Sequence, residues 1–544
     1  MASQMGRYAY SGATRLAEGW SLERLTPPSR LFGANGIRTG PDGRIYVAQV
    51  SGSQISAIDV NSGAIETISP KGGSIVAPDD LVFDAQGNIF TTEITEGRVS
   101  VLSPNGQARV LQGDLPCANP ITIHQGRLFT GECRFDGRIL ELDLNGGAPR
   151  VILENVPLPN AMEVGPDGML YFPVMGANEI WRVNLNGGAP EVVARDLGVP
   201  DAVKFDAQGF IVSTQVASGQ VLRIDPRTGE RTVLATIAPG LDNLTFVGDR
   251  LFVSSISGQI NEILPGGKLQ SLVPDGLNWP LGLAVGSDGV LFVADGGFTY
   301  TLRAGGALQP IGMLFSPGFP GYTRGVAAAG PGEYVVTTAN GQVSRWVPGK
   351  QEHQVLAEGF DQLYGIALAP GGTAIFAEKG RGRLLSVRSD SGHSSLGHSN
   401  AVETLAEGLN QPSGVAFSDD GCLVAEEGAG RVVRTVRGGV ETVLGGLHKP
   451  QGILVRGDLL FVVDVGTKEL IQYNMTSKTR LTIASQLPVG APPGVIPKNL
   501  GAIGVLSGPM GPFAGIAEGP NGALYVSADA EGSVLELRPV SPAH

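Results

Sequence analysis

Six polar residues recur at a regular interval in the first half of the sequence. All are Asn or Asp, their numbers differ by 44, 40, 41, 41 and 41, and each directly precedes a short apolar stretch: Asn35, Asp79, Asn119, Asn160, Asp201 and Asp242. We call the residue in this place the anchor of its repeat. Amide and carboxylate oxygens suit Ca²⁺, with Mg²⁺ and Mn²⁺ as alternatives. None of the six anchors is His or Cys, which argues against zinc. If the fold brings the anchors together, they predict a divalent-cation site.

The second half of the chain repeats the same unit with different anchors. They are Leu281, Arg324, Tyr364, Ser413, Gln451 and Ala514, none of which is Asn or Asp. If the turns required Asn or Asp at this position, the anchors of both halves would carry these residues. The difference between the halves therefore favours a functional role for the anchors of the first half. The alternative is that the six side chains cap strand ends and hold ordered water.

The unit that carries each anchor is about 40 residues long. It contains an apolar strand, a turn such as PDG or AQG, a second apolar strand, and then a third and a fourth strand, which is the content of a propeller blade. Twelve units predict an all-β chain with two tandem six-bladed β-propellers, twelve four-stranded blades in all; a solenoid is the alternative. Since the first strand of a blade lines the axis of its ring, we expect six anchors to meet at one mouth of each ring.

The ends of the chain predict how the rings close. Only one strand follows the last hairpin, and a spare strand-like piece at 14–25 precedes the first blade. We predict that this piece completes blade six and that Lys268–Val273 passes to blade twelve, which leaves no sheet edge exposed. The domains would then be 1–266, a propeller with the polar anchors, and 267–544, a propeller without them.

Two insertions interrupt the repeat. Ser389–Asn400 is rich in Gly and Ser and holds His393 and His398, and we interpret it as a solvated loop rather than a metal site. Leu487–Phe513 carries six prolines among Gly and aliphatic residues, and we interpret it as a lid or packing loop.

Other polar residues should reach the anchor mouth, because the second strand of each hairpin returns to it. In the first half those strands end at Gln49, Glu93, Glu132, Gln215 and Ser255. Glu93 and Glu132 are candidates for a catalytic acid or base, and the alternative is that they hold neighbouring loops by hydrogen bonds. Cys117 and Cys133 flank the strands of blade three at the same end, and we expect reduced thiols rather than a disulfide.

Composition excludes several classes of protein. The 544 residues carry a formal net charge of −12, so the chain lacks the basic surface of a nucleic-acid-binding protein. No apolar run is long enough to span a membrane, and the sequence starts without the apolar stretch of a secretory signal, so we expect no membrane association and a cytoplasmic location. Three cysteines are too few for a disulfide scaffold.

The segments LPNAMEVGPDGMLYF and VPDAVKFDAQGFIV resemble the SMP-30/gluconolactonase/luciferin-regenerating family. The resemblance covers roughly residues 14–266 and implies a six-bladed propeller whose axial divalent cation is held by Glu, Asn, Asn and Asp on blades one, three, four and five. This chain has Asn35, Asn119, Asn160 and Asp201 there, so Asn35 replaces a Glu and one negative charge is lost. We expect Asp79 and Asp242, on the blades that flank blade one, to restore charge. The second half resembles NHL-type propellers.

The resemblance implies a metal-dependent hydrolase that acts on a lactone or related ester of a small molecule. Asp201 would act as the general base for the attacking water, while Asn119 and Asn160 hold the metal and orient the substrate. Two alternatives stay open, because a fold does not fix a function. One is a lyase or condensing enzyme, and the other is a binding or scaffold protein with a structural metal, in which the second propeller recognises a partner protein.

Overall fold

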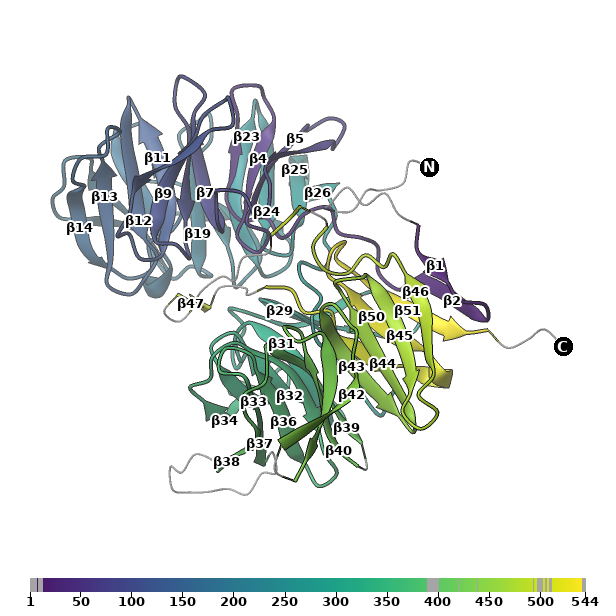
Figure 1. Cartoon of the computed structure of the whole chain (residues 1–544). Coiled ribbons are helices and arrows are strands. Elements are labelled where there is room, and N and C mark those ends of the chain that lie inside the picture. Colours follow the sequence, from purple (N-terminus) through teal and green to yellow (C-terminus); the bar gives the residue numbers. More distant parts are fainter. Residues whose placement is uncertain are drawn as a thin grey trace. The chain divides into compact units, whose positions relative to one another are not determined.

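A computed structural model of the chain describes residues 7, 13–388, 401–418, 420–437, 439–492, 494–496, 502–503, 506–507 and 511–540. The chain divides into two compact units, each a ring of antiparallel sheets (Figure 1). The first propeller is Leu31–Gly276, joined by Val495–Gly508; the second is Leu277–Gly494, joined by Met1–Arg30 and Pro509–His544. The insertion with His393 and His398, and much of Leu487–Phe513, lie outside the described residues.

The described strands form eleven four-stranded sheets, one five-stranded sheet and one two-stranded hairpin. This confirms the expected all-β fold of twelve blades in two six-bladed propellers. The helical residues of the described part are three short 3-10 turns, at Met175–Ala177, Pro265–Gly267 and Pro520–Gly522. No helix in that part has the length and apolar character needed to cross a membrane.

The first strand of each blade is innermost in its ring. In the first propeller these strands are β3 (Ile37–Thr39), β7 (Pro78–Phe83), β11 (Ala118–His124), β15 (Glu163–Val164), β19 (Pro200–Phe205) and β23 (Leu241–Val247). In the second they are β27 (Leu283–Val285), β31 (Thr323–Gly330), β35 (Leu363–Leu368), β39 (Pro412–Ser418), β43 (Pro450–Arg456) and β49 (Ile516–Glu518).

Each innermost strand pairs with a second strand across a tight turn. In the first propeller the second strands are β4 (Ile45–Gln49), β8 (Ile89–Glu93), β12 (Arg127–Glu132), β16 (Met169–Val174), β20 (Ile211–Gln215) and β24 (Arg250–Ser255). Between β3 and β4, Gly43 has a φ of 78°, a left-handed conformation that glycine adopts without a Cβ clash. The turn tripeptides of the sequence therefore return the chain to the anchor end of the blade.

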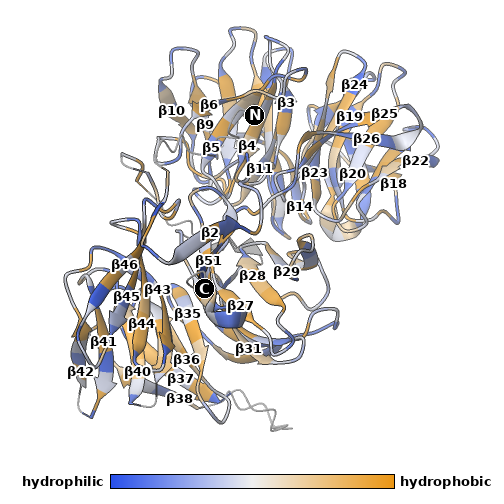
Figure 2. Ribbon diagram, turned by 90° about the vertical axis from the view of Figure 1, so that its right-hand side faces the viewer, coloured by the Kyte–Doolittle hydropathy of each residue, from blue (hydrophilic) through white to orange (hydrophobic). Residues whose placement is uncertain are grey.

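The core lies between the faces of adjacent blades. Ile37, Val47 and Ile58 of blade one pack with Phe252 and Ile260 of blade six. Figure 2 shows the same distribution, with hydrophobic colour along strands such as β36 (Thr373–Glu378) and β43 and hydrophilic colour at many connecting turns. Burial of apolar side chains on both faces of each sheet is the main contribution to holding the blades together.

Both rings are closed by one recurring hydrogen bond. A hydroxyl near the end of the second strand donates to the carbonyl of the next blade's anchor, as Thr92 does to Asn119 at 2.7 Å. Ser254 of blade six donates to the carbonyl of Asn35 at 2.8 Å, which closes the first ring. In the second ring, Ser527 of blade twelve donates to the carbonyl of Leu281 at 2.5 Å.

The predicted wiring of the outer strands is wrong. β26 (Lys268–Val273) pairs with β25 (Ile260–Leu264) and completes blade six. The two strands are joined by a local turn at Gly266 and Gly267, whose φ angles are 78° and 76°. A hairpin this short forms at a smaller entropic cost than a crossing to another ring.

The N-terminal piece completes the second propeller instead. β2 (Trp20–Arg24) pairs with β51 (Ser533–Pro539) in blade twelve, and β1 (Arg15–Leu16) adds a fifth strand to blade eleven. The boundary between the compact units therefore falls after Gly276 rather than at 266, and Met1–Arg30 belongs with the second unit.

Candidate functional site

Four of the six anchors of the first propeller lie in β-bulges, and the other two come shortly before their strands. In blades two, three, five and six, the pairing of the first two strands skips the anchor and the residue after it, as between Pro78 and Leu81 of β7. A bulge leaves these two residues opposite one residue of the partner strand and re-aims their side chains. Asn35 and Asn160 come shortly before β3 and β15. Less than a tenth of the surface is exposed for Asp79, Asn119, Asn160, Asp201 and Asp242.

The carboxylates among the anchors act on one another. The amide Nδ2 of Asn35 donates to Oδ2 of Asp242 at 3.2 Å. Burial, and after it the charges of Asp201 and Asp79, raises the pKa of Asp242 well above its usual range. Burial and the charge of Asp79 likewise raise the pKa of Asp201, and burial with the charge of neighbouring Asp80 raises the pKa of Asp79 to about 8. All three anchors stand where the innermost strands of their blades begin, so the three carboxylates lie at the same end of the ring.

Two buried oxygens of the anchors have no hydrogen-bond partner. They are Oδ1 of Asn119 and Oδ1 of Asp201, and both are buried. By contrast, Oδ1 of Asn160 accepts from the backbone N–H of Ala161 at 2.8 Å, and Oδ1 of Asn35 accepts from that of Val50 at 3.2 Å. A buried polar atom without a partner is unfavourable, and a hard cation would satisfy these oxygens. The donor set therefore fits Ca²⁺.

Acidic side chains alone do not make this site. Among the described residues, no three His, Cys, Asp or Glu side chains lie close enough together to hold a metal ion. A cation at the anchors would therefore need the amide oxygens of Asn119 and Asn160 as well as the carboxylate of Asp201.

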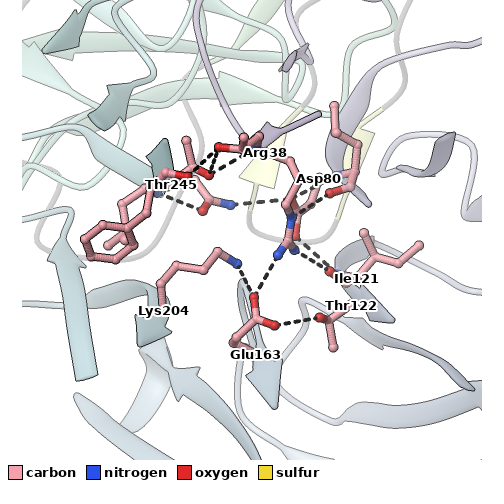
Figure 3. A network of polar contacts seen from close by, with 12 residues as sticks. Arg38, Asp80, Ile121, Thr122, Glu163, Lys204 and Thr245 are labelled. Carbon is pink, nitrogen blue, oxygen red and sulfur yellow. Dashed lines mark hydrogen bonds and ion pairs between the residues drawn. The ribbon is translucent and has the colours of Figure 1, made fainter. Parts of the chain in front are cut away.

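A second polar layer, which the sequence analysis missed, lies further along the innermost strands (Figure 3). We call it the axial network, and it consists of Arg38, Asp80, Thr122, Glu163 and Lys204. Nη1 of Arg38 donates to Oε2 of Glu163 at 2.7 Å, and Nζ of Lys204 lies 3.1 Å from the same oxygen. Blades one and four stand opposite each other in a ring of six, so the Arg38–Glu163 pair spans the axis. The network therefore crosses the axis beyond the anchors.

Charge holds the axial network together. Burial acts to raise the pKa of Glu163, but the charges of Lys204 and Arg38 outweigh it and lower the pKa to about 2. Burial raises the pKa of Asp80, although the charges of Arg38 and Lys204 act to lower it. The carboxylate of Asp80 accepts from the backbone N–H groups of Leu81 at 2.8 Å and Ile121 at 3.3 Å.

The sequence does contain a signal for this network. The third residue after each anchor of the first propeller is Arg38, Val82, Thr122, Glu163, Lys204 and Thr245. In the second propeller the same position reads Ala284, Ala327, Ala367, Ala416, Leu454 and Ala517. Comparing the two halves at this position, as was done for the anchors, would have revealed the charged layer.

The two glutamates proposed as an acid or base are held by arginines. Glu93 and Glu132 are fully buried. Arg98 donates to Glu93 through Nε at 2.9 Å and through Nη2 at 2.7 Å, and Nε of Arg138 donates to Glu132 at 2.9 Å, with Nη2 of Arg138 on its other oxygen. Neither carboxylate has an unpaired oxygen, so each would have to give up an arginine hydrogen bond to act as an acid or base; Glu93 also holds a loop, as the alternative expected.

The same role recurs in the second propeller. Glu93 accepts from the backbone N–H of Val76, in the loop before β7, at 2.7 Å. Glu378 accepts from the N–H of Asp361 at 2.8 Å in the same way. Since the contact occurs where the anchors are not acidic, it belongs to the scaffold rather than to the site.

All three cysteines are free and buried. The backbone N–H of Cys133 donates to the carbonyl of Cys117 at 2.8 Å. Burial, and after it the charges of Asp79 and Asp201, raises the pKa of the Cys133 thiol well above its usual range. The thiol of Cys133 therefore lies at the anchor end of the first propeller, whereas Cys422 belongs to the second.

Comparisons with known proteins give no family. No family model and no curated protein matches the chain. Among solved structures it is similar to a streptogramin B lyase (21% identity, 51% of this chain and 94% of that chain, TM-score 0.38). It is also similar to a gluconolactonase from Xanthomonas campestris (15%, 44% and 91%, TM-score 0.38) and to a chain of a nidogen/laminin complex (20%, 42% and 93%, TM-score 0.39). At these identities and TM-scores the similarities do not identify a function for this chain.

Proposed function

We propose that the first propeller binds a divalent cation at its anchors and hydrolyses a lactone or related ester of a small molecule there. The observation that carries the proposal is the pair of buried, unpaired oxygens, Oδ1 of Asn119 and Oδ1 of Asp201, in a ring whose carboxylates repel one another. A cation satisfies both oxygens and relieves the repulsion. Amide and carboxylate oxygens favour Ca²⁺ over softer ions, with Mg²⁺ and Mn²⁺ as alternatives.

The anchors have separate roles in this proposal. Asn119, Asn160 and Asp201 hold the ion together with Asn35, while Asp79 and Asp242 contribute negative charge. When bound, a divalent cation polarises a substrate carbonyl and stabilises the negative charge that develops on its oxygen. Asp201 has two oxygens, so one is available to accept a proton from the attacking water. Because the axial network crosses the axis behind the anchors, we expect substrate to reach them from their own mouth of the ring.

Calorimetric titration of the full chain with Ca²⁺, Mg²⁺ and Mn²⁺ tests the first half of the proposal. Burial and neighbouring carboxylates raise the pKa values of Asp79, Asp201 and Asp242, so ion binding should release protons and should be tighter at pH 8 than at pH 6. Affinity that does not change with pH would contradict an ion held by these carboxylates.

A panel of lactones and esters, assayed with and without EDTA, tests the second half. Turnover that EDTA abolishes and a product heavier than the substrate by one water support hydrolysis. A product without added water identifies a lyase. Metal binding that raises the melting temperature without any turnover identifies a binding protein with a structural ion.

A further inference from the structure

The anchor of blade eight is an arginine with an unpaired, buried nitrogen. Arg324 is 1% exposed, and its Cζ lies 5.1 Å from the centre of the Tyr364 ring. Nη1 donates to the carbonyl of Leu363 at 3.0 Å, whereas Nη2 has no hydrogen-bond partner. Burial lowers the pKa of Arg324 to about 10, which still leaves the guanidinium charged at neutral pH.

The acid beside Tyr364 is already paired with another cation. Nζ of Lys379 lies 5.2 Å from the same tyrosine ring and 2.8 Å from Oε2 of Glu427. In the part of the chain that the structure describes, no carboxylate pairs with Arg324. The insertion Leu487–Phe513 contains no Asp or Glu. The surroundings of Tyr364 therefore hold an excess of positive charge, and a buried charge without a counter-ion is strongly unfavourable.

A small cavity lies on the axis of the second propeller, beside the residues that follow Arg324 and Tyr364 in the chain. A cavity of about 40 Å³ is lined by the six glycines that follow the anchors, including Gly325 and Gly365, and by Phe513. The ring of Phe513 lies 5.8 Å from that of Tyr364. The hydroxyl of Thr323, the residue before Arg324, is also buried without a partner. The space holds only a few atoms, and two unpaired polar groups belong to the strand that borders it.

We propose that the anchor end of the second propeller binds a small singly charged anion, of the size of chloride or formate, which pairs with Arg324. Such an anion accepts from Nη2 and supplies the missing counter-charge. The apolar rings of Tyr364 and Phe513 disfavour a strongly hydrated dianion. The site is in the other propeller from the proposed cation site and does not depend on it.

Thermal unfolding of the full chain tests this site. Chloride or formate is added at constant ionic strength, with the large buffer anion of HEPES as the replacement. We expect either small anion to raise the melting temperature of the wild type by about 2–4 °C. Arg324→Met should melt above the wild type without small anions, because it removes the unpaired charge, and should not respond to them.

The control is Arg456→Met. Arg456 also lies over an aromatic ring, 5.0 Å from the centre of Phe461, but it has Glu518 as its own partner at 3.4 Å. This variant should keep the full response to chloride and formate. Equal anion responses in Arg324→Met and the wild type would overturn the proposal.

A measurement on the wild type alone decides the case if Arg324→Met does not fold. The ³⁵Cl resonance of chloride should broaden with the protein present, and formate should reverse the broadening if the two anions share the site. Broadening that formate does not reverse identifies a chloride site, and a formate-induced melting shift without broadening identifies a carboxylate site. Neither effect in the wild type means that no anion binds, and the proposal fails.

Discussion

The two propellers share a scaffold and differ in what stands on the axis. Both place a bulge at the anchor of most blades, and both close through a hydroxyl that donates to the next anchor's carbonyl. In the first propeller the anchors are all Asn or Asp and a charged network follows them; in the second the anchors are of mixed types, and the positions one and three residues after them hold glycine and alanine or leucine. In both rings the anchor takes part in closure through its backbone carbonyl and not through its side chain, so the anchor side chains are free to carry chemistry.

The residue after each anchor shows the difference most directly. In the second propeller it is always glycine: Gly282, Gly325, Gly365, Gly414, Gly452 and Gly515. A Cβ at Gly414 would overlap the carbonyl oxygen of Gln451, and the other five glycines meet the next anchor's carbonyl in the same way. In the first propeller the position holds Gly36, Asp80, Pro120, Ala161, Ala202 and Asn243. The second ring therefore packs backbone against backbone where the first accommodates side chains.

The largest effect is expected from Asp201→Asn. The change keeps the size of the side chain and one ligating oxygen but removes charge and basicity. We expect weaker metal binding and any turnover lowered by about two to four orders of magnitude. Asp79→Asn and Asp242→Asn should lose less, and Ser413→Ala, at an anchor of the second propeller, should lose nothing. Metal titration and kcat/KM for these variants provide the check; unchanged metal affinity in Asp201→Asn would remove the cation from the anchors.

Sequence periodicity was sufficient to find the anchors, because a repeat in a closed ring places equivalent residues at one mouth. It did not separate functional from structural acids. Glu93 and Glu132 have suitable types and positions, yet their roles depend on Arg98 and Arg138, which a pattern of strands does not connect to them. The Arg38–Glu163 pair joins opposite blades, a contact that follows only from the closure of the ring.

The second prediction concerns the glycines of the second propeller. Gly414→Ala should destabilise the chain by about 2–3 kcal/mol, because the new methyl group has to displace the backbone of Gln451. Gly439→Ala, which meets nothing within 4 Å, is the control and should change stability little. Urea unfolding of the full chain measures both. Equal stability of the two variants would mean that the rings are not distinguished by backbone packing.

The third prediction uses the charge of the axial network. The folded pKa of Glu163 is about 2, below its ordinary 4.5, so its contribution to stability is present above pH 4.5 and is lost as the pH falls towards 2. The wild type should lose roughly 2 kcal/mol more than Glu163→Gln between pH 5 and pH 3.

Asp295 in the second propeller provides the contrast. Burial raises its pKa to about 7 from 3.8, so its contribution is full below pH 3.8 and is lost as the pH rises to 7. Asp295→Asn should therefore change the pH dependence in the opposite direction. Denaturant unfolding at several pH values tests both signs, and a wild type and Glu163→Gln with parallel pH profiles would contradict the role given to the network.

The wiring of the rings shows a different limit of the sequence. The sequence correctly indicates the number of strands and a spare strand at the N-terminus. These observations do not determine which ring that strand completes. The choice depends on the turn at Gly266 and Gly267, which makes Lys268–Val273 a local hairpin partner and leaves blade twelve to be completed by Trp20–Arg24. The glycine turn at Gly266 and Gly267 predicts the pairing of these strands better than the assumption that the two propellers exchange outer strands.

The smallest effect is expected from Asn35→Glu, which restores the residue type that the resembled family has on blade one. In the structure, Asn35 donates to Asp242 at 3.2 Å. A carboxylate in its place loses that hydrogen bond and repels Asp242, so the variant should be less stable than the wild type without an ion. With calcium the added charge becomes favourable, and we expect an affinity about tenfold higher, worth about 1.4 kcal/mol.

Ser413→Asp in the second propeller is the matched control, because it adds a carboxylate at an anchor of a ring that has no Asn or Asp at its other anchors. Calcium should stabilise Asn35→Glu more than the wild type and should not rescue Ser413→Asp. Equal calcium responses in the two variants would show that a carboxylate at any anchor is enough to bind the ion. The two propellers would then differ only in charge, and the arrangement of Asn119, Asn160 and Asp201 would not matter.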